Sequence, residues 1–439
     1  MTWFWVLVGL FVLGLMVLVH EWGHFIVAKM LGVRVDVFSI GFGPRLFGWR
    51  RGPTDYRVSV LPLGGYVRMA GDNPSEDREG APDEFLSQPR WSRALIVFAG
   101  PATNVVVAVL LLAGLYAVRF EKPAFLDEPA RLESVTPDSP AARAGLQAGD
   151  LIVEIAGVRN PTWEKVQVET LLGGKESLAV TVRRGDEEFA RTLQPELHGP
   201  REIPIVGWLP YEPVIVAEAD PSMPAARAGL QVGDELVAID GDSTSEIGQQ
   251  GFVEKVKKSE GAPLLLTVRR NGQTLEISVA AEKRSWRGET GYFLGVQLGP
   301  RLRSVRLGIF AALQQSVVDN LKLTGLLYDL LGRLFTGRAS VSSLEGPIGI
   351  VSISGQAARI GLDRLTMFMA MISINLAVLN LLPVPILDGG HLALLAIEAV
   401  WRRDLSLPVK ERAMQVGLVL LLLLFAVVMY NDIMRYFIR

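Results

Sequence analysis

The stretch VLVHEWGHFIVA, from Val17 to Ala28, places two histidines and a glutamate inside an apolar run. Ionisable side chains are costly in hydrocarbon, so they are rare in membrane spans unless they have a function. On a helix, positions i and i+4 share a face, so His20 and His24 can bind one metal ion while Glu21 serves as a base. The alternative is a pair of buried histidines held by neighbouring helices, but that leaves Glu21 without a partner in hydrocarbon.

The whole chain has the composition of a membrane protein. It has 439 residues, 49% of them hydrophobic, and its mean hydropathy is +0.30. The net charge of -2 and the absence of a long basic block argue against a nucleic-acid partner. Because the chain has no cysteine, a metal site must use His, Asp or Glu.

Four stretches are long and apolar enough to cross a bilayer, which takes about 20 residues. They run approximately over residues 3–28, 94–118, 365–387 and 414–430. The first lacks the basic start and the cleavage site of a signal peptide, so we expect it to be retained. Lysines and arginines gather between the first two spans and between the last two, which predicts that both loops are cytoplasmic. Both termini and the long segment between the second and third spans should then lie outside.

An internal repeat lies between the second and third spans. SPAARAGLQAGDLIVEIAG, Ser139 to Gly157, returns as MPAARAGLQVGDELVAIDG, Met223 to Gly241. Each copy predicts a short helix, a Gly-Asp turn and an alternating strand. Two copies indicate two small α+β domains, at residues 124–212 and 213–300.

The repeat resembles PDZ domains of the bacterial kind, which capture an extended peptide by strand addition. The resemblance implies peptide-binding strands late in each copy. These would contain Ile205 and Val206 in the first copy, and Phe293 and Leu294 in the second. The alternative is that they are ordinary core strands of a spacer domain.

Two histidines do not complete a catalytic zinc site, which usually has three protein ligands and one open position. The segment NLLPVPILDGGH, residues 380–391, follows the third span and offers a third ligand. Asp388 lies on a glycine-flanked turn after Pro383 and Pro385, which break the helix, so its carboxylate can point inward at membrane depth. His391, one turn further on, is a competing ligand, and we favour Asp388. The other alternative for Asp388 is a helix-terminal residue at the membrane interface.

The H-E-x-x-H of the first span and the N-x-x-P-x-P-x-L-D-G-G of the third resemble the site-2 protease family of intramembrane zinc metalloproteases. The resemblance covers nearly the whole chain. Further matching pieces are FSIGFGP (38–44), LPLGGYVRM (61–69), AGPATN (99–104) and GPIGI (346–350). The resemblance implies one Zn²⁺ per chain held by His20, His24 and Asp388, with Glu21 as the general base. The implied fold class is a multi-pass α-helical membrane protein with four transmembrane helices and two α+β PDZ-like domains inserted between the second and third spans.

Substrate contacts are implied near the third metal ligand. Asn380 matches a family position that contacts the substrate backbone, and Pro383 and Pro385 lie beside it in the same motif. An interhelical hydrogen bond is the alternative role for Asn380.

A second substrate-binding element is expected in YRVSVLPLGGYVRMAG, residues 56–71. It alternates like a strand and then breaks at Pro62 and at Gly64 and Gly65. In the family this region is a membrane-associated hairpin whose edge can pair with an extended substrate. An ordinary cytoplasmic hairpin is the alternative.

The predicted organisation has nine segments. They are a first transmembrane helix (1–33), a hairpin region (34–93), a second transmembrane helix (94–120), PDZ-like domains (124–212 and 213–300), amphipathic helices on the outer membrane face (301–364), a third transmembrane helix with the L-D-G motif (365–392), a cytoplasmic loop (393–413) and a fourth transmembrane helix with the C-terminus (414–439).

The resemblance implies a protease that cuts the transmembrane segment of single-pass membrane proteins already trimmed on their outer side, such as an anti-sigma factor or remnant signal peptides. The PDZ pair would act as a substrate filter. The lipid bilayer is the other partner, and the implied location is the bacterial inner membrane, with the active site near the cytoplasmic side. The alternative is a membrane-anchored PDZ binding protein with a non-catalytic metal site. It is disfavoured because Glu21 is present and no fourth ligand is evident. A zinc transporter is disfavoured by the large peptide-binding module.

Overall fold

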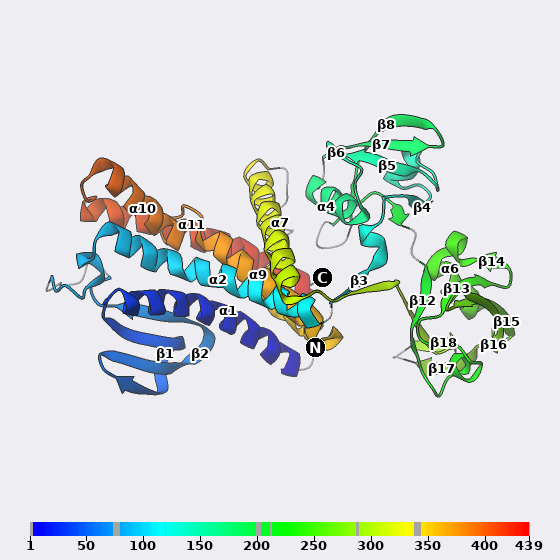
Figure 1. Cartoon of the computed structure of the whole chain (residues 1–439), viewed down its shortest axis with the longest axis horizontal. Helices are drawn as coiled ribbons and strands as arrows, with labels where there is room; N and C mark the ends of the chain where they lie inside the picture. The colour runs from blue at the N-terminus through cyan, green and yellow to red at the C-terminus, as the bar shows by residue number, and fades with distance from the viewer. Residues whose placement is uncertain are drawn as a thin grey trace. The chain divides into compact units, whose positions relative to one another are not determined.

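The computed structural model describes residues 3–72, 80–118, 120–174, 176–198, 203–210, 213–286, 289–337 and 344–438. The chain divides into two units. The helical unit consists of Met1–Phe120 and Arg306–Arg439, and the β-rich unit consists of Glu121–Val305. Figure 1 shows the helical unit in blue and cyan and again in yellow to red, and the β-rich unit in teal and green.

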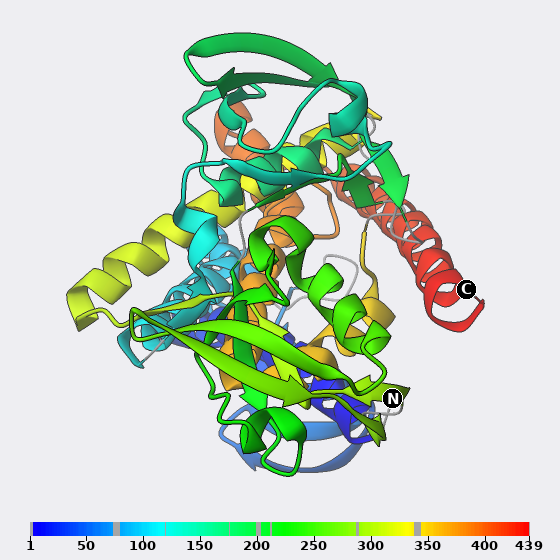
Figure 2. The same cartoon turned by 90° about the vertical axis from the view of Figure 1, so that its right-hand side faces the viewer.

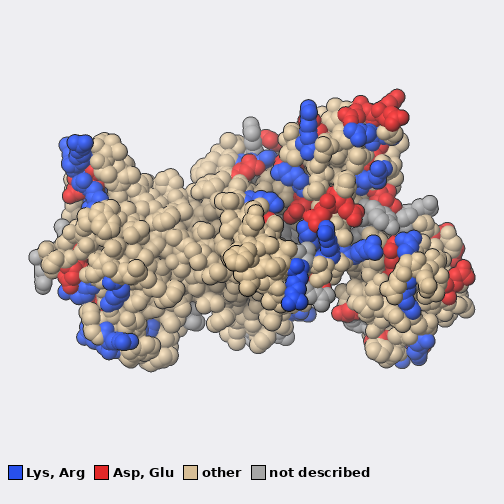
Figure 3. All heavy atoms as spheres, in the orientation of Figure 1, with Lys and Arg blue, Asp and Glu red and all other residues tan. Residues whose placement is uncertain are grey.

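Four helices in the described part of the helical unit are long and apolar enough to cross a membrane. They are α1 (Trp3–Met30), α2 (Arg90–Val118), α9 (Leu362–Asn380) and α11 (Leu407–Ile433), the last continued by a π-helical turn at Met434–Ile438. Figure 3 shows a broad surface without charged side chains over the middle of this unit. This pattern is that of a protein body surrounded by hydrocarbon.

The third predicted span, residues 365–392, is not a single helix. Helix α9 ends at Asn380, and a new helix, α10 (Asp388–Trp401), begins at the predicted metal ligand. Two prolines lie between them, and proline both lacks the N–H that a helix interior needs and clashes with the preceding turn. The segment 393–413, which the sequence predicts to be a loop, is helical in α10 up to Trp401 and again in α11 from Leu407.

Two further helices follow the β-rich unit in the chain. Helix α7 (Ile309–Phe335) packs against α2 and α9, and α8 (Pro347–Ile360) packs against α1. Asp432 of α11 is completely buried, and its carboxylate accepts hydrogen bonds from the backbone N–H groups of Gly346 and Gly349, each at 3.0 Å. A carboxylate at a helix N-terminus is favoured by the unpaired N–H groups and the helix dipole, so this contact fixes α11 to the start of α8.

A β-hairpin made of β1 (Val35–Arg51) and β2 (Thr54–Met69) follows α1. Residues 35–40 pair both with 65–69 and with 55–58, and residues 45–51 pair with 54–59. Strand β2 continues through Gly64 and Gly65, where the sequence predicted a break. The register between β1 and β2 nevertheless shifts repeatedly. A one-turn 3-10 helix (Phe85–Ser87) then leads to α2.

The hairpin lies against the first span. A Cβ atom added at Gly64 would lie 3.0 Å from Val17 Cγ1, and one added at Gly65 would lie 3.6 Å from Leu18 Cδ1. Because Val17 and Leu18 are in the middle of α1, this part of the hairpin reaches the level of the centre of the span.

The β-rich unit contains two lobes with the same succession of elements (Figure 1 and Figure 2). The first lobe, residues 128–210, contains β4 (Leu132–Val135), α3 (Pro140–Arg143), β5 (Leu151–Ile155), β6 (Val158–Arg159), α4 (Trp163–Gly173), β7 (Leu178–Arg184), β8 (Glu187–Leu193), β9 (Glu196–His198), β10 (Ile203–Ile205) and β11 (Trp208–Pro210). Its sheets have the orders β6-β5-β7-β8, β11-β4 and β10-β9. One apolar core, with Trp163 and Ile155 among its members, fills this lobe.

The second lobe, residues 213–299, has its own core around Phe252. It contains β12 (Val214–Ala219), α5 (Pro224–Arg227), β13 (Glu235–Ile239), β14 (Asp242–Ser243), α6 (Thr244–Lys258), β15 (Pro263–Arg270), β16 (Gln273–Ala280), β17 (Glu282–Trp286), β18 (Glu289–Phe293) and β19 (Val296–Gly299). The main sheet has the order β16-β15-β13-β12-β19, and β17 pairs with β18. The strands β3 (Phe120–Pro123) and β20 (Leu302–Val305), at the two ends of the unit, pair with each other, and a 3-10 turn (Ala124–Asp127) follows β3.

The Gly-Asp turn of the sequence repeat has the same role in both lobes. The carboxylates of Asp150 and Asp234 are buried, and each accepts hydrogen bonds of 2.7 or 2.8 Å from an arginine, Arg184 and Arg270 respectively. Each also accepts a hydrogen bond from the backbone N–H three residues earlier. Burial alone would raise the pKa of these carboxyl groups, but the hydrogen bonds and the arginine charge outweigh it and hold both pKa values below the usual range.

Candidate metal centre and active site

Three side chains from the two ends of the chain converge inside the helical unit. His20 Nε2 lies 3.2 Å from His24 Nε2 and 3.0 Å from Asp388 Oδ2, and His24 Nε2 lies 3.5 Å from the same oxygen. In a tetrahedral zinc site with bonds of about 2.0 Å, neighbouring donor atoms are about 3.3 Å apart. Asp388 Oδ2 is buried and receives no hydrogen bond from the described residues. The donor set and its spacing therefore fit a zinc ion.

Contacts of the Nδ1 atoms, the ring nitrogens that face away from the metal position, orient the two imidazoles. His24 Nδ1 lies 2.9 Å from the carbonyl oxygen of Ile96 on α2, a distance at which Nδ1–H donates and Nε2 keeps its lone pair for a metal. His20 Nδ1 lies 3.4 Å from the side-chain amide of Asn104, also on α2. Each predicted histidine ligand is therefore held from the second span.

Asn104 has the chemistry that His20 requires. The residue is completely buried, and its Oδ1 atom has no hydrogen-bond partner among the described residues. When His20 binds a metal through Nε2, its Nδ1 carries the proton and needs an acceptor. The amide oxygen and nitrogen of asparagine are assigned by their surroundings, and exchanging them places Oδ1 beside Nδ1 and satisfies both atoms. The backbone carbonyl of Asn104 accepts a 2.8 Å hydrogen bond from Ser373 of α9, which fixes its position.

Close approach of α1 and α2 depends on two glycines. A Cβ atom at Gly100 would lie 2.3 Å from His24 Nε2, and one at Gly23 would lie 2.4 Å from the carbonyl oxygen of Ala99. Small residues let membrane helices approach this closely. Gly100 and Asn104 are four residues apart and thus share a face of α2. Both belong to AGPATN (99–104), a segment for which the sequence predicted no site residue, although a buried asparagine in a membrane span was a usable signal.

Glu21 faces the hairpin. Its Oε2 atom accepts a 3.1 Å hydrogen bond from the backbone N–H of Val67 in β2. Oε1 is bonded to no described residue. The contact brings the predicted base next to the strand that was expected to bind substrate.

The turn before α10 positions Asp388. A Cβ atom at Gly389 would lie 2.2 Å from the carbonyl oxygen of Leu381, and one at Gly390 would lie 2.1 Å from that of Val384. The two glycines therefore let the proline-containing segment fold back onto the first turn of α10. Within this segment, Leu387 N–H bonds to the Val384 carbonyl at 2.8 Å.

The remaining residues of this motif surround the turn. Asn380, the last residue of α9, is half-buried, and its side chain has no hydrogen-bond partner in the described part of the chain, so the alternative interhelical bond is absent here. Pro383 lies within the turn, and Pro385 faces Gly417 of α11.

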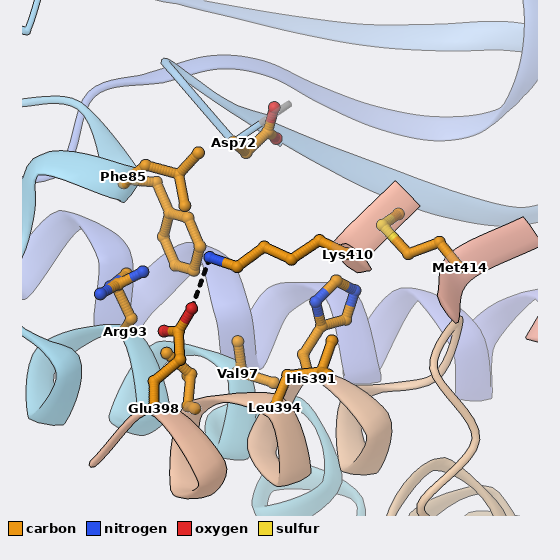
Figure 4. Close-up of a pocket in the computed structure, with 11 residues that line it drawn as sticks. Asp72, Phe85, Arg93, Val97, His391, Leu394, Glu398, Lys410 and Met414 are labelled. Atoms are coloured by element: carbon orange, nitrogen blue, oxygen red, sulfur yellow. Dashed lines mark ion pairs between the residues drawn. The ribbon is translucent and has the colours of Figure 1, made fainter. Parts of the chain in front are cut away.

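His391 lines a cavity of about 90 Å³, whose walls combine apolar side chains with a few charged ones. Figure 4 shows His391, Glu398 and Lys410 around this cavity. Glu398 is buried, pairs with Lys410 Nζ at 2.6 Å and accepts the backbone N–H of Leu405 at 3.0 Å. Among the described residues, the group with metal-ligand spacing contains His20, His24 and Asp388 and not His391.

The predicted peptide-binding residues of the lobes have mixed placements. The side chains of Val206 and Leu294 are buried in the cores of the first and second lobe. Ile205, at the end of β10, is exposed, and Phe293 is the last residue of β18. Strand β10 contacts α4 and strand β18 contacts α6. Ile205 and Phe293, at the strand ends, could therefore contact a peptide through their side chains, whereas the buried side chains of Val206 and Leu294 could not.

The site combines two histidines and an aspartate with an adjacent glutamate, within apolar helices, which is the arrangement of a membrane-embedded peptidase. Residues 8–424 match peptidase family M50. The chain belongs to this family, the site-2 protease family, and the resemblance inferred from the two motifs is confirmed.

Relatives match over almost their whole length. The chain is 33% identical over 451 residues to the regulator of sigma E protease of Salmonella typhi, covering 96% of this chain and 97% of the relative. It is 32% identical over 449 residues to the regulator of sigma-E protease of Escherichia coli, with the same coverage. The regulator of sigma E protease of Haemophilus influenzae is 33% identical over 462 residues, covering 99% of this chain and all of the relative. A PDZ domain of an SdrC-like protein from Listeria monocytogenes is 20% identical over 20% of this chain and 90% of its own, with a TM-score of 0.18, and carries no argument about the fold.

Proposed function

We propose that this chain is an intramembrane zinc metalloprotease that hydrolyses a peptide bond within the transmembrane segment of single-pass membrane proteins. The observation that carries the proposal is the convergence of His20, His24 and Asp388 beside Glu21, inside apolar helices of a peptidase family. A structural zinc site has four protein ligands, whereas three ligands with an adjacent carboxylate leave room for water and substrate.

His20, His24 and Asp388 would hold one zinc ion, which supplies a polarised scissile carbonyl and a water of lowered pKa. Ile96 and Asn104 keep the two imidazoles in the tautomer that presents Nε2. The hydrogen bond from Val67 orients Glu21 through Oε2, which leaves Oε1 to take a proton from the attacking water. Glu21 then gives this proton to the leaving amine, as a general base that becomes a general acid.

A substrate segment must be extended to be cut, because the backbone carbonyl groups of a helix are occupied by hydrogen bonds within the helix. Unpaired backbone is costly in hydrocarbon, so an edge strand at that depth would stabilise the extended segment. Strand β2 is such a strand, since it reaches the middle of α1 at Gly64 and Gly65 and bonds to Glu21 at Val67. Asn380, with a free side-chain amide beside Pro383 and Pro385, is placed in the metal-ligand motif to bind the opposite side of the substrate.

The two lobes are proposed to be PDZ-like domains that filter substrates. Their repeated order of elements and the contact of a late strand with a helix in each lobe support this assignment. The substrate would be a membrane protein already trimmed on its outer side, such as an anti-sigma factor or a remnant signal peptide. The lysines and arginines of the short loops support an orientation with the lobes and both termini outside. The proposed location is the bacterial inner membrane, with the metal site nearer the cytoplasm.

The decisive experiment is cleavage of a tagged, trimmed single-pass substrate in liposomes by wild type and Glu21→Gln. We expect the substitution to lower the rate by about 10²–10⁴-fold, the range of general acid–base catalysis, while bound zinc measured by elemental analysis stays at one per chain. Trp22→Phe, a change at the neighbouring, half-exposed position, is the matched control and should keep activity. Equal cleavage by wild type and Glu21→Gln contradicts the proposal. Zinc binding without cleavage of any of several substrates favours the membrane-anchored PDZ binding protein.

A further inference from the structure

Large apolar side chains cover much of the hairpin without being buried. In β1, Leu46, Phe47 and Trp49 are 61%, 62% and 62% exposed. Val60 and Leu61 on the facing part of β2 are also exposed. A ribbon with apolar groups this exposed is unfavourable in water, and this one lies at the side of a membrane span.

Contacts with α1 give this ribbon a deep end and a shallow end. At the deep end, Gly64 contacts Val17 in the middle of α1, and Phe42 lies nearby in the same sheet. At the shallow end, Lys29, in the last turn of α1, donates a 2.7 Å hydrogen bond to Thr54 Oγ1. The turn between β1 and β2 is therefore level with the cytoplasmic end of the first span.

The position of the charged groups depends on depth along the ribbon. Arg45 lies towards the deep end, but its guanidinium reaches back to Asp55 Oδ1 at 3.2 Å, next to the shallow turn. Arg57 also approaches Asp55, at 3.9 Å. A long basic side chain that brings its charge back to the interface is expected for a segment in lipid. Residues 42–61 contain four arginines and one aspartate, a net charge of +3.

Arg50 and Arg51 are basic residues at the shallow end with no hydrogen-bond or ion-pair partner among the residues that the structure describes. Both are exposed. Trp49, beside them, stacks on Tyr56 with a ring separation of 5.7 Å and an interplanar angle of 11°. Tryptophan and tyrosine concentrate at the head-group level of membranes, and guanidinium groups bind phosphate oxygens in pairs. Figure 3 shows the basic side chains gathered over the hairpin.

We propose that Arg50 and Arg51, together with Trp49, form a binding site for the head groups of anionic phospholipids at the cytoplasmic interface. The apolar deep end of the ribbon then lies among acyl chains, and the two arginines hold the shallow end at phosphate level. The occupant is an anionic lipid rather than a protein because the free charge is uniformly positive and sits directly above an exposed apolar surface. The site does not depend on the proposed proteolytic activity.

The test is a lipid titration of the full-length chain in neutral detergent, with bound lipid counted by native mass spectrometry. We expect phosphatidylglycerol to bind more tightly than phosphatidylcholine. Each basic residue near an anionic surface is worth about fivefold in affinity, so Arg50→Gln with Arg51→Gln should weaken phosphatidylglycerol binding roughly thirtyfold and leave phosphatidylcholine binding unchanged.

The matched control is Arg159→Gln with Arg191→Gln, two exposed arginines of the β-rich unit that lie outside the apolar spans and their short loops. It should stay within about twofold of wild type, whereas Arg50→Lys with Arg51→Lys, which keeps the charge, should retain most of the preference. Equal binding of both lipids by wild type overturns the proposal, and so does an equal loss in the control pair. If the glutamine variant unfolds, the test uses the lysine variant, titrated with both lipids. Equal binding of phosphatidylglycerol and phosphatidylcholine by the lysine variant would also overturn the proposal.

Discussion

His20 Nε2 lies 3.0 Å from Oδ2 of Asp388, although one residue belongs to the first helix of the chain and the other to the tenth. The metal centre therefore exists only when α10 is held next to α1. Helix α2 makes this possible, since it contacts both of them and supplies Gly100, Ile96 and Asn104 around the histidines. Changes in α2 should accordingly affect metal binding without touching a ligand.

Asn104 is predicted to be a positioning residue for His20. Asn104→Leu removes the acceptor for Nδ1–H and should lower zinc affinity about 10–100-fold, the usual effect of losing such a partner, with a matching loss of activity. Asn104→Asp keeps an acceptor and should retain zinc better than Asn104→Leu. Chelator competition measures the affinity. Ser373→Ala, which removes only the bond to the Asn104 backbone, is the control, and equal affinities in all three variants would contradict the assigned role.

Gly100→Ala should abolish zinc binding in a chain that still folds. The added methyl group would lie 2.3 Å from His24 Nε2, which forces α1 and α2 apart at the histidines. Gly114→Ala is a matched control in the same helix, because nothing lies within 4 Å of its added methyl group. Zinc content and helical circular dichroism separate the two effects. Full zinc occupancy in Gly100→Ala would show that the helices do not approach as closely as described.

The lobes should lose stability in acid. Because the pKa values of Asp150 and Asp234 are lower in the folded state than in the unfolded chain, their stabilisation is present above the unfolded value of about 3.9 and is lost as the pH falls through the folded-state values. Urea unfolding of fragment 121–305 between pH 7 and pH 2.5 measures this. Stability should fall steeply below about pH 4 in wild type.

Asp150→Asn should already be less stable at pH 7 and should show a weaker decline in acid. Asp186→Asn, an exposed change in the turn between β7 and β8, is the control and should follow wild type. A wild-type profile that is flat below pH 4 would show that the two arginine pairs do not stabilise the lobes.

Removal of the β-rich unit should widen the range of substrates. The backbone N–H of Leu307 donates to the carbonyl of Tyr116 at 2.9 Å, so the ends left after excision of residues 121–305 are adjacent and a short Gly-Ser linker can join them. If the lobes are a filter, the shortened chain should cut an untrimmed substrate at least tenfold faster than wild type, and a trimmed substrate at a similar rate. The same excision with Glu21→Gln controls for other proteases. Continued rejection of untrimmed substrate would rule out the filter.

Local features of this protein could be predicted from sequence. The spacing of His20 and His24 places both on one helix face wherever that helix lies, and the apolar lengths of the spans follow from bilayer thickness. The repeat around Asp150 and Asp234 predicted a repeated local structure because turn and strand patterns depend on neighbouring residues.

Other features depended on tertiary packing. The sequence favoured Asp388 over His391 by its place in the motif, but only the folded chain brings the carboxylate of Asp388 to the two histidines and leaves His391 lining a neighbouring cavity. The end of α9 at Asn380, the support of His20 by Asn104 and the bond between Glu21 and Val67 were likewise decided by the fold. The physical reason is that these contacts join segments far apart in the chain, and the side chains that meet are selected by how closely α1, α2 and the hairpin pack rather than by any local periodicity.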